Sequence, residues 1–141
     1  MFTFQNAIRR TGDAPALTDF SDAAGVPVDQ PALMGGGGHG ASPEEFFLAA
    51  INSCQMMTLY FFAKKFGLEI QSYESDAAGV IEKSAAGALS FSSVTVKARA
   101  SFAAAVTPET TAKLIGLTEK YCLVSRSLQT PVRFELEVTS A

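Results

Sequence analysis

Two cysteines, Cys54 and Cys122, are the side chains of this sequence best suited to chemistry, and they stand 68 residues apart. A cysteine thiolate can attack an electrophile, bind a metal or exchange with a disulfide. With one histidine, His39, the chain has too few ligands for a four-ligand structural zinc site unless carboxylates are recruited. Two cysteines are also too few for a disulfide-rich secreted scaffold. We therefore expect no metal and no cofactor, and any reactivity should belong to the thiols.

Each cysteine also has a purely structural interpretation. Cys54 falls in the middle of a predicted helix, where helical spacing places apolar side chains such as Phe47 and Phe61 on its face. Small buried thiols in such surroundings often serve only in packing. Cys122 falls where a second predicted helix ends, and the same interpretation applies to it. These observations leave both interpretations open.

The helix that must carry Cys54 is predicted over residues 42–65. Ser42, Pro43 and Glu45 occupy the N-cap, N1 and N3 positions of a capping box, and Gly67 follows as an exit signal. The apolar stretch 46–63 approaches the length that spans a bilayer, but it is interrupted by Asn52, Ser53, Gln55 and Thr58. We expect a buried helix rather than a membrane span. Because one sheet face cannot cover a helix that is apolar nearly all round, we expect a homodimer.

The remaining pattern predicts the order strands, helix, strands, helix, strand. Short strands and turns fill the first 40 residues, strands follow at 72–82 and 90–102, a helix starts at Thr107 and Pro108, and a strand covers 132–139. Apolar and polar residues alternate in the later strands, so one sheet face should be buried. The prediction is a single α+β domain over residues 1–141, with an antiparallel sheet packed against two main helices.

Composition and charge exclude several classes of protein. The chain is 48% hydrophobic, and its 11 basic and 14 acidic residues give a net charge of −3 without any basic block. A disordered tail and a nucleic-acid partner are therefore not expected. The amino terminus lacks the apolar run of a signal peptide, so we expect a cytoplasmic protein with no membrane partner. The glycine run 35–38 lacks the lysine of a phosphate loop, which favours a flexible connector with a solvated His39.

Two segments resemble the OsmC/Ohr family of thiol peroxidases. The run GASPEEFFLAAINSC, from Gly40 to Cys54, is similar to the start of the family's central helix, which carries its reactive cysteine. The run CLVSRSL, from Cys122, is similar to the second cysteine motif, and the interval between the cysteines agrees as well. Gln55 and Leu123 depart from the aromatic residue and the proline found in many members. The resemblance covers most of residues 35–141 and implies an OsmC/Ohr-like fold as an intertwined homodimer.

The resemblance implies a thiol-dependent peroxidase for organic hydroperoxides. Cys54 would become a sulfenic acid, Cys122 would trap it as a Cys54–Cys122 disulfide, and an external dithiol, of the lipoyl type in some members, would reduce that disulfide. The position of Cys122 after a helix carboxyl end also suits the resolving role, because that end disfavours a thiolate. The competing interpretation is a non-catalytic dimeric module that binds an apolar ligand between its helices.

A thiol among apolar side chains needs a cation to become a good nucleophile. The family's arginine has no counterpart at its OsmC-type position, which holds Met34, whereas Arg9 or Arg10 meets the Ohr-type position near the amino terminus. Arg126, four residues after the second cysteine, is a further candidate.

Glu44 matches the glutamate that holds this arginine in the family. It precedes Cys54 by ten helical residues, or about 15 Å, so a site composed across the dimer interface is expected. The alternative is that Glu44 only complements the positive amino end of its helix.

Overall fold

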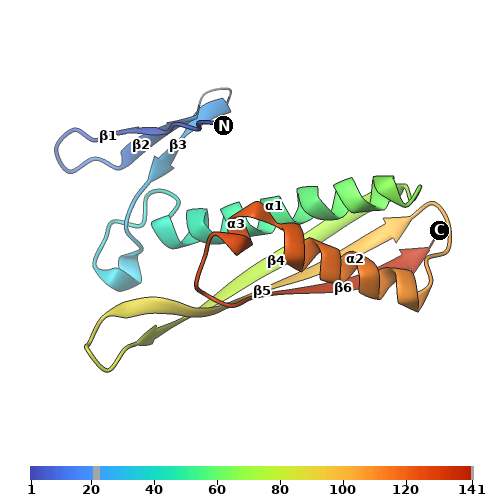
Figure 1. Cartoon of the computed structure of the whole chain (residues 1–141). Helices are drawn as coiled ribbons and strands as arrows, with labels where there is room; N and C mark the ends of the chain where they lie inside the picture. The colour runs from blue at the N-terminus through green and yellow to red at the C-terminus, as the bar shows by residue number, and fades with distance from the viewer. Residues whose placement is uncertain (21–22, 141) are drawn as a thin grey trace. The chain divides into compact units, whose positions relative to one another are not determined.

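The structure is a computed structural model that describes residues 1–20 and 23–140. These residues form two compact units, Met1–Phe47 and Leu48–Ala141, which we describe in turn. Apart from the short η1 and α3, the elements follow the predicted order (Figure 1): β1 (Ala7–Arg9), β2 (Ala16–Phe20), β3 (Ala23–Val28), η1 (Ala32–Met34), α1 (Pro43–Lys65), β4 (Ile70–Lys83), β5 (Leu89–Phe102), α2 (Pro108–Tyr121), α3 (Leu123–Arg126) and β6 (Val132–Ser140). One domain over residues 1–141 stays a prediction.

The amino-terminal unit contains a three-stranded antiparallel sheet in the order β1-β2-β3. The glycine-rich loop that follows is folded back on itself. The Asp29 carboxylate accepts the backbone N–H groups of Gln30 and His39 at 2.9 and 3.1 Å, and both bonds help to lower its pKa, that of His39 most. A Cβ on Gly36 would lie 2.0 Å from the Gln30 carbonyl oxygen. Gly36 therefore permits close backbone packing in this loop. The sequence predicted a flexible connector here and did not predict this packing.

Helix α1 begins as predicted. The Ser42 backbone N–H donates to the Glu45 carboxylate at 2.7 Å, and the Glu45 N–H donates to the Ser42 hydroxyl at 3.1 Å, which completes the capping box. At the other end Gly67 adopts a positive φ of 69°, and the Leu68 N–H closes the last turn on the Ala63 carbonyl. By length and composition alone α1 could cross a membrane, a property shared by core helices of soluble proteins.

The carboxyl-terminal unit has a three-stranded sheet in the order β4-β5-β6. β4 and β5 pair antiparallel, but β5 and β6 pair parallel, with Val94 opposite Val132 and Ala100 opposite Val138. The prediction of an antiparallel sheet is therefore wrong for the last strand. The helices α2 and α3 carry the chain back to the end at which β5 began, and such a crossover makes β6 run in the same direction.

The core of this unit lies between the sheet and helices on one of its faces (Figure 1). Alternate residues of β5 point into it, and the pattern predicted the first four of them: Val94, Val96, Ala98, Ala100 and Phe102. From α1 come Ile51, Gln55, Leu59 and Ala63, a stripe at every fourth residue. The opposite side of α1 leaves Met57 and Phe61 67% and 55% exposed in the single chain. A homodimer that covers them stays a prediction.

Helix α2 begins at the predicted Thr107 and Pro108, and the Thr107 hydroxyl accepts the Thr110 N–H at 3.1 Å. The short helix α3, one residue after the end of α2, was not predicted. Cys122 lies between the two, as the C-cap of α2 and the N-cap of α3. Cys122 therefore adjoins the amino end of α3 as well as the carboxyl end of α2, and the sequence predicted only the latter.

Candidate functional site

Cys54 lies in the middle of α1, half-buried, and lines an open groove of about 600 Å³. The other lining residues come from α1 and from the segment where α2 ends and α3 begins: Ala50, Ser53, Met57, Thr58, Phe61, Phe62, Tyr121, Leu123 and Val124. Most of these side chains are apolar. A small organic molecule in the groove would therefore meet the Cys54 thiol among hydrophobic side chains.

The aromatic side chains of Phe61, Phe62 and Tyr121 line this groove. The rings of Phe62 and Tyr121 join α1 to α2, with their centroids 5.5 Å apart. Lys65 places its Nζ 4.8 Å from the centroid of Phe61, and Lys120 places its Nζ 5.2 Å from that of Tyr121. The groove therefore has an aromatic lining, and a lysine ammonium lies over two of its rings, those of Phe61 and Tyr121.

Cys122 lies next to Cys54 in the structure. Its side chain is 0% exposed, and the Ser125 hydroxyl donates a hydrogen bond to its Sγ atom at 3.2 Å. Burial raises the pKa of the Cys122 thiol, the neighbouring Cys54 thiol raises it further, and Ser125 opposes both effects. Both thiols are free. Two cysteines separated by 68 residues thus interact, and one of them, Cys54, lines the groove.

This arrangement combines a thiol that a ligand can reach with a second thiol that it cannot. Such a pair can give up two electrons and two protons to an oxidant by forming a disulfide. Cys54 is placed to meet the oxidant, because it lines the groove, and Cys122 is placed to react only with Cys54. The geometry is suited to two-electron thiol chemistry on a molecule with an apolar part.

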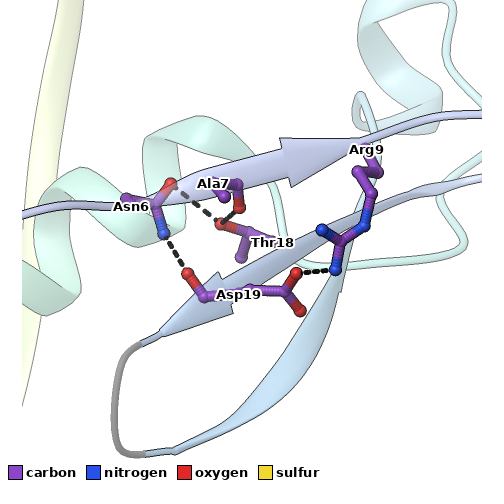
Figure 2. A network of polar contacts seen from close by, with 5 residues as sticks. All are labelled: Asn6, Ala7, Arg9, Thr18 and Asp19. Carbon is purple, nitrogen blue, oxygen red and sulfur yellow. Dashed lines mark hydrogen bonds and ion pairs between the residues drawn. The ribbon is translucent and has the colours of Figure 1, made fainter.

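The three candidate arginines have different surroundings. Arg9 forms an ion pair with the Asp19 carboxylate (Figure 2), in a network in which the Thr18 hydroxyl donates to Asn6 at 3.0 Å. Arg10 donates from Nε to the Ala14 carbonyl oxygen at 3.1 Å and lines a cleft of about 540 Å³ in the amino-terminal unit. Arg126 ends α3 with an exposed side chain. Arg9 already has a carboxylate partner.

Glu44 lines the same cleft as Arg10, together with Asp13, Asp29 and His39. Its Oε2 atom is buried and has no hydrogen-bond partner among the residues that the structure describes. A buried carboxylate oxygen is costly to leave unpaired. The sequence-predicted site residues thus fall into two groups: Arg9, Arg10 and Glu44 belong to the amino-terminal unit, and Cys54 and Cys122 belong to the carboxyl-terminal unit.

Ser125 is the residue of this site that sequence reasoning missed. It stands in the CLVSRSL run, three residues after Cys122. The spacing of one helical turn could have indicated it, had the short α3 been predicted. Over residues 1–20 and 23–140, no group of three or more histidine, cysteine or acidic side chains is placed to hold a metal ion.

Comparisons with known proteins identify the family and the fold. The model of the OsmC-like protein family matches residues 35–137. An OsmC-like protein of unknown function from Vibrio cholerae has a similar structure, with a TM-score of 0.87 at 21% identity over 97% of this chain and 100% of that one. An organic hydroperoxide resistance protein from Elizabethkingia anophelis gives 0.77 at 20% identity, over 100% and 98%. The organic hydroperoxide resistance protein OhrB of Bacillus subtilis gives 0.70 at 22%, over 98% of each chain. No curated protein sequence matches the chain.

Proposed function

Because this chain belongs to the OsmC-like protein family, we propose that it is a thiol-dependent peroxidase that reduces organic hydroperoxides through Cys54 and Cys122. The observation that carries the proposal is that these two thiols interact and that one of them, Cys54, lines an apolar groove. Two structural relatives are named organic hydroperoxide resistance proteins, which supports the substrate class. We propose that the protein acts in the cytoplasm and needs no metal, cofactor, nucleic acid or membrane.

The proposed reaction begins with the Cys54 thiolate in the groove. It attacks the outer oxygen of the hydroperoxide, so that a sulfur–oxygen bond forms and the oxygen–oxygen bond breaks. The departing alkoxide takes up a proton and leaves as the alcohol. The sulfenic acid on Cys54 is then attacked by the Cys122 sulfur, which expels water and forms the disulfide. An external dithiol reduces the disulfide and returns the enzyme to its starting state.

Arg10 is the arginine that we propose for stabilising the Cys54 thiolate and orienting the peroxide oxygens. Arg9 is occupied by Asp19, whereas Arg10 shares a cleft with Glu44, whose Oε2 lacks a partner. A carboxylate holds a guanidinium in a defined orientation through paired hydrogen bonds. We therefore propose that Glu44 holds Arg10 in the active dimer.

The substrate preference can be predicted from the groove. With dithiothreitol as the reductant, cumene hydroperoxide should be consumed at least about tenfold more efficiently than hydrogen peroxide, because the aromatic lining binds its organic part. The measurement is kcat/KM for both peroxides. Equal values would contradict the assignment of this groove as the binding site, and no turnover of either would contradict the proposed function.

The homodimer gives a second prediction. Sedimentation at micromolar concentration should yield about twice the 14.9 kDa chain mass, because exposed apolar side chains on α1 need a partner. Met57→Asp should shift the equilibrium toward monomer, while Glu82→Gln on exposed β4 serves as the control. A folded wild-type monomer at this concentration would contradict the interface.

A further inference from the structure

The Ser125 hydroxyl contacts a sulfur atom that takes part in the proposed reaction. It donates to the Cys122 Sγ atom at 3.2 Å from the third residue of α3. Neither Ser125 nor Cys122 lines the groove, whereas Cys54 does. Ser125 is therefore placed to act on the second thiol without touching the hydroperoxide.

The exposure of the two sulfurs indicates which one a reductant can reach. Thiol–disulfide exchange requires the attacking thiolate to approach one sulfur directly, while the other sulfur leaves. Cys54 is half-buried at the groove, and Cys122 is 0% exposed. A dithiol that enters the groove can therefore attack Cys54, so that Cys122 has to be the leaving group.

Cys122 is a poor leaving group unless a neighbouring group stabilises its thiolate. A sulfur leaves faster when the pKa of its thiol is lower. Burial and the neighbouring Cys54 raise the pKa of Cys122, whereas the Ser125 hydroxyl, and after it the Ser125 backbone N–H, lower it. Hydrogen bonds to a charged acceptor are about twice as strong as those between neutral groups, so the Ser125 contact should strengthen as negative charge develops on the sulfur.

Resting on the proposed function, we infer that the reductant attacks the Cys54 sulfur and that the Ser125 hydroxyl stabilises the departing Cys122 thiolate. A bond forms between the sulfur of the dithiol and Cys54, and the Cys54–Cys122 bond breaks with its electron pair on Cys122, which then takes up a proton. The second thiol of the reductant attacks its own bound sulfur, closes a cyclic disulfide and releases the Cys54 thiolate. Two electrons pass from the dithiol to the cysteine pair.

The first test measures the rate of disulfide reduction. The disulfide is prepared with diamide, which oxidises neighbouring thiols without any peroxide, and is then reduced with dithiothreitol in a stopped-flow instrument. Ser125→Ala should slow the reduction about tenfold, the effect expected from losing one hydrogen bond to a charged atom. Ser125→Thr should restore the rate. Ser127→Ala is the matched control, since its hydroxyl donates to the Leu123 carbonyl oxygen in the same segment.

A second measurement separates this role from a structural one. In a Cys54→Ser background, ultraviolet absorbance of the thiolate reports the pKa of Cys122. This pKa should rise in Ser125→Ala and should be unchanged in Ser127→Ala. An unchanged pKa together with an unchanged reduction rate would overturn the role of Ser125.

The site of attack is read by mass spectrometry. Glutathione, a monothiol, is added to the diamide-made disulfide, the reaction is quenched with acid, and the peptides are mapped. The glutathione adduct should lie on Cys54 and the freed thiol on Cys122, and the reverse pattern would overturn the inference. If diamide cannot join the thiols, the inference also fails. If diamide joins them but a hydroperoxide does not, the proposed function fails while the reduction step can still be measured.

Discussion

Replacing Cys54 with serine is expected to abolish the consumption of organic hydroperoxide. The hydroxyl of serine is a far weaker nucleophile at neutral pH than a thiolate, and Cys122 is not among the described residues that line the groove. Turnover with cumene hydroperoxide and dithiothreitol should fall by at least about 1000-fold, to the background of the assay. The residual rate of Cys54→Ser, with folding verified by circular dichroism, is the measurement. Retention of the wild-type rate would contradict the mechanism.

The matched variant at the second thiol should behave differently. Cys122→Ser keeps the nucleophile but removes the resolving sulfur, so the first oxidation should proceed and stop at a sulfenic acid on Cys54. A dimedone-type probe should then label Cys54 in this variant and not in Cys54→Ser. Because Cys122 is fully buried, Cys122→Ala serves as a second variant that places no hydroxyl in the core.

Glu44→Ala is expected to lower kcat/KM for organic hydroperoxide by about 100-fold, as for the loss of a group that orients a catalytic cation. Glu45→Ala is the matched control, because that neighbour bonds to Ser42 in the capping box and should cost only about 1 kcal/mol of stability. If Glu44 merely complements the helix amino end, the two variants should differ little in activity.

Mixing inactive chains tests whether Glu44 acts on the Cys54 of its partner. Ten residues of α1 separate the two, about 15 Å of rise, whereas an antiparallel partner helix would bring them together. After subunit exchange, an equimolar mixture of Glu44→Ala and Cys54→Ser chains should regain about a quarter of wild-type activity, since half of the dimers are mixed and each has one intact site. No recovery would contradict action in trans.

The double variant supplies the control for this experiment. When Glu44→Ala/Cys54→Ser chains are mixed with wild-type chains in equal amounts, action in trans leaves about a quarter of the activity, because only wild-type dimers have a complete site. Action within one chain would leave about half. Action in trans therefore predicts about a quarter of wild-type activity in both mixtures, whereas action within one chain predicts no recovery in the first mixture and about half in the second.

The parts of the fold that could be predicted from the sequence are those encoded by local rules. The capping box of Ser42 and Glu45 and the Thr107–Pro108 start fix the two main helices, because each depends on residues within one turn. The alternation from Val94 to Phe102 likewise marks the buried face of β5. The pairing of Cys54 with Cys122 was implied by a family resemblance and not by any local pattern.

What could not be predicted depends on contacts distant in sequence. A period of two marks β6 as a strand but carries no information on whether it runs parallel to β5. The four residues of α3 are too few for a periodic signal, so the contact of Ser125 with Cys122 could not be predicted from the sequence. The ion pair of Arg9 arises from the register that sets Ala7 opposite Asp19, and this pairing distinguishes Arg9 from Arg10.

Peptide mass spectrometry after brief treatment with one equivalent of cumene hydroperoxide tests the central claim most directly. The folded protein, first reduced and freed of reductant, should lose two hydrogens within seconds, and the peptides of Cys54 and Cys122 should become joined by a disulfide. Dithiothreitol should reverse the change. Free thiols on both cysteines in folded, treated protein would contradict the account and favour a module that only binds an apolar ligand.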